Sequence, residues 1–165
     1  MASFNSIQNL SNVQRMLFVS TSAVPTAATD AIAYSTSASI SFSKDDIDIS
    51  NKTDGNWAKS RAGKKSAELS VDALCAKSGV GKGETDLFAA WKAGTSLHFK
   101  YAYITVTEQA DGSTNIAIDT TRPAYTGVLL VSSLDISSDD GEVCKYSCSA
   151  NSQGKVTRVA GTPAT

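Results

Sequence analysis

The chain has 165 residues, of which 41% are hydrophobic and 19% charged, and its net charge at pH 7 is −1. A chain of this length forms one domain whose core is stable without metals or disulfides. The lack of a basic excess argues against avid nucleic-acid binding, because such binding relies on lysine and arginine to neutralise phosphates.

The first part of the chain shows the period-two alternation of strands. Residues 1–15 are polar with scattered apolar positions and predict an N-terminal arm, and a first strand is expected over 16–21. Over 31–42, apolar residues alternate with serines, which predicts a strand with one hydroxyl-bearing face. Residues 44–51 predict a short acidic strand or strand end, and a turn-rich polar loop is expected over 52–65.

One α-helix is predicted over residues 84–93. Thr85 can cap it, and an acidic residue follows in the first turn, where the helix dipole favours negative charge. Gly94 provides a stop signal. The helix is short, so its stability must come from an apolar stripe docked on a sheet, and that stripe is expected to comprise Leu87, Phe88 and Trp91.

The remaining segments predict a β-rich domain. Asp111-Gly112 is a hairpin turn signal. Strands are expected over 67–75, 97–108, 114–119, 125–136, 142–150 and 155–159. About eight strands with one helix favour a mostly β fold, a β-sandwich or barrel with a short flanking helix. Residues 16–160 then form a single domain, and residues 161–165 form a loose C-terminal tail.

Catalytic and cofactor-binding patterns are not found in the sequence. His98 is the single histidine and lies in a predicted strand, and no Gly-x-Ser-x-Gly motif occurs. The glycine-rich segment 79–85 fails the phosphate-loop pattern, because Ala76 and Gly83 stand where glycine and a hydroxyl residue are required. We therefore expect no enzyme activity and no cofactor.

The three cysteines do not form a disulfide framework, because the set is odd and sparse. Cys144 and Cys148 fall on one predicted strand, where four residues at about 3.3 Å each separate them by more than about 10 Å. We expect them and Cys75 to be small buried or half-buried residues. Cysteine and histidine together are also too few for a zinc site.

The N-terminal segment, Met1 to Leu10, lacks a basic stretch followed by an apolar run, so we expect no signal peptide. No apolar stretch of 18 residues occurs, so we expect no membrane anchor.

Two features of the polar region invite a functional interpretation. Trp57 lies in a loop without a local core, so it either folds back on its own domain or, with Arg61 nearby, anchors a protein interface. The carboxylates Asp45, Asp46 and Asp48 do not match a calcium loop in spacing. They are instead expected to be solvated charges at a strand edge, which discourage unwanted strand pairing.

The order of these segments resembles the major tail tube proteins of long-tailed bacteriophages, especially the family typified by lactococcal siphophages. The resemblance covers most of residues 30–160. It rests on the acidic segment 44–50, the tryptophan-containing stretch 56–63, the alternating segment 65–74, the helix that leads into a strong strand, and the late acidic turn within 132–143. The cysteines and the Ala/Ser-rich start depart from the pattern.

The resemblance implies a structural virion protein. Six subunits would form a ring whose sheets join into an inner β-barrel, and stacked rings would make a hollow tube for double-stranded DNA, without specific binding. The N-terminal arm and the loop at about 44–65 would contact the next ring, through Asp45, Asp46, Asp48, Trp57 and Arg61. The implied partners are a tape-measure protein, a tail terminator and a baseplate or distal tail protein. The implied location is the virion tail, after assembly in the bacterial host cytoplasm.

Two alternatives remain open from the sequence. The chain could be the tube protein of a contractile injection system, which shares this fold. It could also be a β-sandwich binding or head-decoration module, for which the single tryptophan in the polar loop is the one hint.

Overall fold

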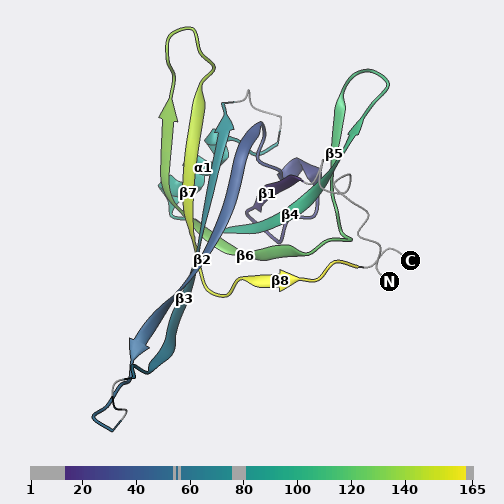
Figure 1. The fold of residues 1–165 in the computed structure, drawn as a ribbon. Helices are drawn as coiled ribbons and strands as arrows, with labels where there is room; N and C mark the ends of the chain where they lie inside the picture. The colour runs from purple at the N-terminus through teal and green to yellow at the C-terminus, as the bar shows by residue number, and fades with distance from the viewer. Residues whose placement is uncertain (1–13, 54, 56, 76–80, 163–165) are drawn as a thin grey trace.

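Eight strands and one α-helix make up the described part of the computed structural model, residues 14–53, 55, 57–75 and 81–162 (Figure 1). A short 3-10 helix, η2, spans Ala28–Asp30, and the α-helix α1 spans Glu84–Ala93. The strands are β1 Gln14–Ser20, β2 Ser35–Asp48, β3 Ser60–Leu74, β4 Leu97–Glu108, β5 Thr114–Ile118, β6 Ala124–Ser137, β7 Lys145–Ser152 and β8 Thr157–Val159. The predictions of a mostly β fold and of a helix over 84–93 are confirmed.

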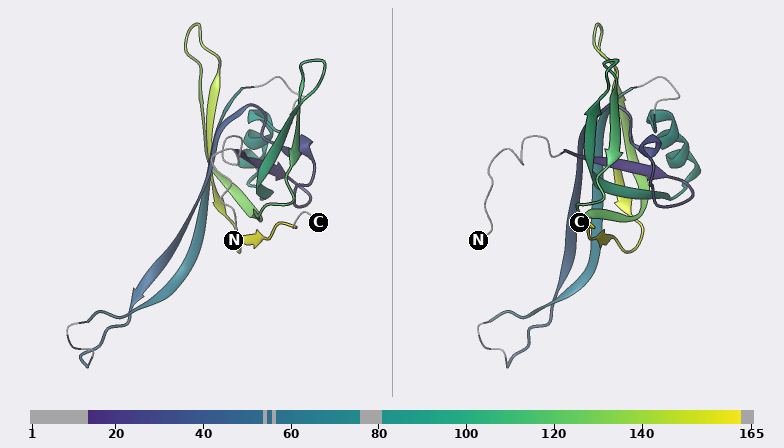
Figure 2. Two further views of the ribbon diagram at one scale, coloured as in Figure 1. Left: turned by 45° about the vertical axis from the view of Figure 1, so that its right-hand side comes forward. Right: turned by 90° about the vertical axis from the view of Figure 1, so that its right-hand side faces the viewer.

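All eight strands belong to one antiparallel sheet with the order β1-β4-β6-β7-β3-β2. Strand β5 pairs with β4, and β8 pairs with β6. The sheet curls like half a barrel (Figures 1 and 2). Because of this curl, the Tyr101 hydroxyl of β4 donates a hydrogen bond of 2.9 Å to the carbonyl of Ala38 in β2. A single curled sheet is thus the form that the predicted sandwich or barrel takes.

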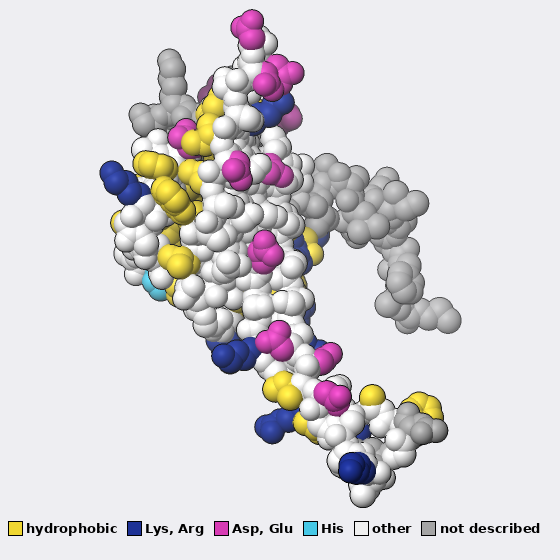
Figure 3. Space-filling model, turned by 90° about the vertical axis from the view of Figure 1, so that its left-hand side faces the viewer, with side chains coloured by type: hydrophobic (Ala, Val, Ile, Leu, Met, Phe, Trp, Pro, Cys, Tyr) yellow, Lys and Arg dark blue, Asp and Glu magenta, His cyan; other side chains and the backbone are white. Residues whose placement is uncertain are grey.

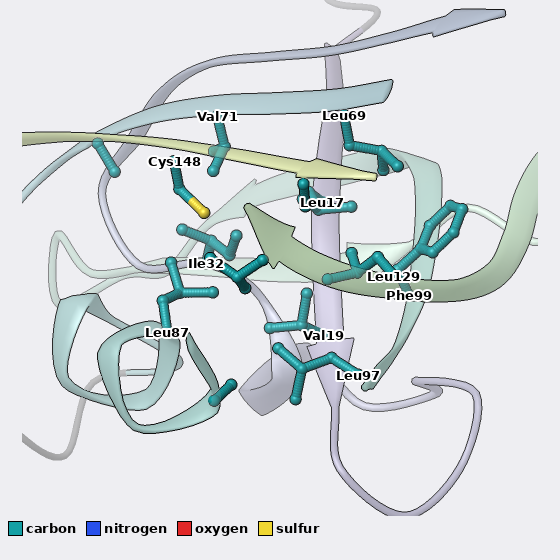
Figure 4. Close-up of a cluster of buried hydrophobic side chains, with 14 of the residues drawn as sticks. Leu17, Val19, Ile32, Leu69, Val71, Leu87, Leu97, Phe99, Leu129 and Cys148 are labelled. Atoms are coloured by element: carbon teal, nitrogen blue, oxygen red, sulfur yellow. The ribbon is translucent and has the colours of Figure 1, made fainter. Parts of the chain in front are cut away.

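The main core lies between the inner face of this sheet and α1 (Figure 4). The period-two pattern of β4 buries Leu97, Phe99 and Tyr101 on this face, while the residues between them point to the other face. Strands β1, β3, β6 and β7 add alternating apolar residues in the same way. A smaller cluster on the opposite face of β1 and β4 includes Phe18 and Ala102. Strands β1 and β4 are therefore covered by apolar clusters on both of their faces.

The helix docks on the sheet with a narrower stripe than predicted. Leu87 and Ala90 are its buried residues, whereas Phe88 and Trp91 are exposed, with ring centroids 5.8 Å apart. The prediction that these two aromatics pack on the sheet is wrong. The reason is geometric: positions 87 and 90 share the face toward β6, and the small Ala90 lets the helix approach closely.

The helix boundaries differ slightly from the predicted capping. The helix begins at Glu84 after Gly83, so Thr85 lies within the first turn and is not the cap. The Gly83 N–H donates a hydrogen bond of 3.2 Å to the Asp86 carboxylate. At the other end, Gly94 has a φ of +63°, a left-handed conformation that glycine adopts without strain, as its predicted role as a stop requires. The helix of the described chain is too short and polar to span a membrane.

Two predicted boundaries in the polar region are wrong. The expected strand over 31–42 and the acidic segment after it form one continuous strand, β2. Strand β3 already begins at Ser60, so part of the predicted loop over 52–65 is also strand. This two-stranded ribbon is exposed on both faces, so its side chains lack the apolar alternation that marks a half-buried strand. The predicted N-terminal arm lies outside the described residues, except for Gln14 and Arg15, which belong to β1.

Candidate assembly interface

Residues 44–65, called the arm below, form the far half of the β2–β3 hairpin. Asp46 pairs with Ala62 and Asp48 with Ser60, so the ribbon continues almost to the tip. The arm extends well away from the rest of the molecule (Figure 2). An isolated two-stranded ribbon has little stability of its own in water, so such a projection is typical of a segment that packs against another molecule.

A register shift marks the base of the arm. Between the pairs Lys44–Lys65 and Asp46–Ala62, β3 contains one residue more than β2. Gly63 lies at this bulge, where a side-chain carbon would come within 3.0 Å of the Asp45 backbone oxygen. Bulges bend a strand and increase its twist, so this position sets the direction in which the arm leaves the sheet.

All five residues predicted for the inter-ring contact lie on the arm, between its base and its tip. Asp45, Asp46 and Asp48 lie on the β2 side of the arm, Arg61 lies on the β3 side opposite Ile47, and Trp57 lies near the tip. Trp57 is 84% exposed and does not fold back on its own domain. The interpretation of Trp57 as a residue that folds back on its own domain is therefore wrong, and its role as an interface anchor stays a prediction.

Two acidic residues of the arm, Asp46 and Asp48, have local partners. The Asp48 carboxylate accepts a hydrogen bond of 2.8 Å from the Ser50 N–H, and hydrogen bonding by Ser50 lowers the pKa of Asp48. Asp46 forms an exposed ion pair of 3.3 Å with Lys44. Within the described ranges, no group of three or more histidine, cysteine or acidic side chains could hold a metal ion.

A second surface is the outer face of the layer β2-β3-β7-β6, which carries mainly hydroxyl groups. The strand registers place Ser39, Ser70, Ser149 and Ser133 in one row across the four strands. The Ser39 and Ser70 hydroxyls are hydrogen-bonded at 2.7 Å, and so are those of Ser43 and Ser66. The sequence predicted the serine face of β2, but its extension over three further strands follows only from their pairing order.

Asp72 organises the next row of this face. Its carboxylate accepts hydrogen bonds from the Ser37 hydroxyl at 2.6 Å and the Ser147 hydroxyl at 2.8 Å, one on each neighbouring strand. These bonds, with Ser37 the larger cause, lower the pKa of Asp72. The carboxylate therefore stays ionised at neutral pH and adds negative charge to a surface of small polar groups.

The same four-stranded layer has two strand edges that are unpaired among the described strands. Strand β2 pairs with β3 alone. On the other side of the layer, β6 pairs with β4 only through residues 125–129, so residues 130–137 are paired with β7 alone. Unpaired edges offer N–H and C=O groups to a further strand, so one chain presents two different sites for strand addition.

Two of the three cysteines, Cys75 and Cys148, have thiols with raised pKa values. Cys148 is buried and Cys75 and Cys144 are half-buried, as predicted. Burial raises the pKa of Cys148 to about 11, and the hydrogen bond with Cys144 is the largest cause that raises the pKa of Cys75 to about 11. The thiolate is the nucleophilic and metal-binding form, so at neutral pH these two thiols are inert packing groups.

The sequence matches one protein family over most of its length. A family model described as phage tail tube protein matches residues 11–158. The chain belongs to the phage tail tube protein family. This tail tube protein is therefore a structural tube subunit, and the sequence resemblance to tail tube proteins is confirmed. No curated protein sequence matches the chain.

Solved tube structures share the fold of this tail tube protein. The tail of an empty gene transfer agent particle, with C6 symmetry, matches with a TM-score of 0.61 and 20% identity over 93% of this chain and 100% of the other. The SPP1 tail tube matches with a TM-score of 0.56 and 14% identity over 93% and 78%. The sheath-tube complex of the contractile injection system PVC matches with a TM-score of 0.53 and 14% identity over 89% and 88%. At these low identities, the similarity shows the fold alone.

Proposed function

We propose that six copies of this tail tube protein form a ring, and that rings stack into a hollow tube through which double-stranded DNA passes. The observation that carries this proposal is the pair of unpaired strand edges on the four-stranded layer. A ring needs a heterologous contact, in which one surface of each copy binds a different surface of the next. The edges of β2 and of β6 residues 130–137 are two such surfaces on opposite sides of one layer.

Pairing β2 of one copy with β6 of its neighbour would join the layers into a closed barrel. Closure removes the open edges that would otherwise favour aggregation. The C6 symmetry of the gene transfer agent tail, which has the same fold, supports six as the number of copies.

The serine-rich face would then line the lumen. Several of its hydroxyls are bonded to one another or to Asp72, and Glu68 and Asp135 add further negative charge. Strand β7 also carries the basic residue Lys145, whose Nζ is paired with the Glu142 carboxylate at 3.0 Å. DNA binding depends on lysine and arginine, so such a wall lets DNA pass without holding it.

In this assembly, the arm contacts the next ring through Asp45, Asp46, Asp48, Trp57 and Arg61, together with residues 1–15. The subunit has no catalytic role. A tape-measure protein, a tail terminator and a baseplate or distal tail protein set the length and ends of the tube. The tube assembles in the bacterial host cytoplasm and belongs to the virion tail.

The proposal is tested by negative-stain electron microscopy of the purified protein over a concentration series, with light scattering on the same samples. We expect rings and tubes with an open lumen, and six-fold symmetry in end-on class averages. Rings with another symmetry would overturn the six-fold assignment. A protein that remains monomeric throughout the series, and also when mixed with isolated tail tips, would contradict the tube itself.

A tube inside a contractile injection system is the second candidate, because the PVC sheath-tube complex shares the fold. The two candidates differ in the outer surface of the tube, where only a contractile system needs a sheath. Purification of native particles separates them. A sheath protein in stoichiometric amount with the tube would identify a contractile system.

A further inference from the structure

The two ends of the sheet carry different turns. Strand pairing places Leu74 beside Lys145, so the β6–β7 turn lies at the end of the layer away from the arm. The β4–β5 turn lies at that same end, as Figures 1 and 2 show in three orientations. We call residues 106–113 and 135–143 together the acidic end.

The arm and the acidic end have opposite charge. The arm carries six basic and four acidic residues, a net charge of +2. The acidic end has no lysine or arginine within these ranges and six carboxylates: Glu108, Asp111, Asp135, Asp139, Asp140 and Glu142. One of them, Glu142, is paired with Lys145 just outside the ranges. Figure 3 shows acidic side chains gathered toward the end opposite the arm, and lysine and arginine side chains along the arm beside its acidic residues. The charge difference follows the long axis of the molecule.

Both surfaces also expose apolar side chains among these charges. The arm exposes Ile47, Ile49 and Trp57, and the acidic end exposes Val106, Ile136 and Val143. Scattered apolar residues are normal on a protein surface. Here they occur at both ends of one axis and lie among charged residues. An apolar centre with a polar rim is the usual composition of a protein interface.

We propose that the arm of one copy docks on the acidic end of a second copy along the tube axis. The inference rests on the proposed tube. It adds that the acidic end receives the arm, and that attraction between opposite charges selects this surface. A second copy is the occupant because the complementary charge is present on the opposite end of this same chain. Trp57 and the isoleucines of the arm contact the exposed valines and Ile136, while arm lysines face the carboxylates. Charge complementarity fixes the register and disfavours contact between two like ends.

The test uses charge reversal at exposed positions of the full chain. One variant carries Lys64→Glu and Lys65→Glu, which changes the net charge of the arm from +2 to −2. The other carries Glu108→Lys, Asp139→Lys, Asp140→Lys and Glu142→Lys, which changes the net charge of the acidic end from −6 to +2. Each variant alone places like charges opposite one another, so we expect the protein concentration required for tubes to rise at least about tenfold. An equimolar mixture of the two variants should form tubes again. The arm of each variant can then contact the end of the other variant, which has the opposite charge.

Lys92→Glu combined with Lys82→Glu serves as the control, since it reverses two lysines in or beside α1, outside both surfaces. It should assemble like the wild-type protein. Circular dichroism and melting temperature verify that each variant is folded. Salt gives a second readout: wild-type stacking should weaken from 0.1 M to 1 M salt, as the screening length falls from about 10 Å to about 3 Å.

The failure of this inference differs from the failure of the proposed tube. Wild-type tubes together with unchanged assembly of both variants would overturn the docking of arm on acidic end, and the tube would stand. Folded variants that fail alone and also fail as a mixture would overturn it equally. A wild-type protein that forms no rings or tubes contradicts the proposed function and, with it, this inference.

Discussion

Trp57 is the most exposed large apolar side chain of the described chain, and it lies at the far end of a polar hairpin. An aromatic residue in water at such a place adds nothing to the core of its own subunit. It can contribute only in contact with another molecule, where tryptophan is enriched among the residues that dominate binding.

We predict that Trp57→Ala weakens ring stacking and leaves subunit stability unchanged. Loss of an interface anchor costs on the order of 2 kcal/mol, or roughly a thirtyfold weaker contact. The measurements are the protein concentration at which tubes form and the melting temperature of the subunit. Trp91→Ala, on the exposed face of α1, is the matched control and should leave stacking unchanged. Normal assembly with a lowered melting temperature in Trp57→Ala would refute the prediction.

Local sequence signals predicted some elements well and others poorly. Strand β4 and helix α1 were predicted at their observed bounds, because alternation, turn residues and the Gly94 stop are all local. The faces of α1 were predicted wrongly, since Leu87, Phe88 and Trp91 lie close together on a helical wheel. Only the position of the sheet decides which of them is buried. The arm was missed as a strand pair because nothing covers either of its faces.

The buried stripe of α1 gives a prediction at the scale of this element. Leu87→Ala should lower the free energy of unfolding by about 2–5 kcal/mol, because it leaves a cavity among Ile32 and the sheet residues. Phe88→Ala removes a larger side chain from an exposed position and should cost less than about 1 kcal/mol. Urea unfolding of both variants measures the difference. Equal losses would mean that the helix docks with the other face.

At the scale of the whole molecule, the sequence predicts the alternation along each strand but not the order in which the strands pair. Alternation indicated a serine face, yet the row from Ser39 through Ser70 and Ser149 to Ser133 depends on the order β2-β3-β7-β6. That order joins segments far apart in the chain. The open edge of β6 could not be found from sequence either, because residues 130–137 have the same alternation as a strand paired on both sides.

Hydrogen exchange tests the assembly surfaces together. In free subunits, amides of the arm and of the two unpaired edges should exchange quickly, since such groups open at little cost in free energy. In tubes we expect strong protection over residues 44–65 and 130–137 and over the edge of β2, with little change in β4. Mass spectrometry of peptides from subunits and tubes provides the comparison. Identical exchange in both states over these ranges would contradict both the edge pairing and the stacking contact.

The slender shape of the arm has a mechanical consequence. If the arms form the joints between successive rings, each joint consists of two-stranded ribbons with a glycine bulge at their base. Each ring, by contrast, would be a closed barrel, which resists deformation. Elastic compliance would then be concentrated between rings, so that the tube could bend through small tilts at many joints while its bore kept a constant diameter.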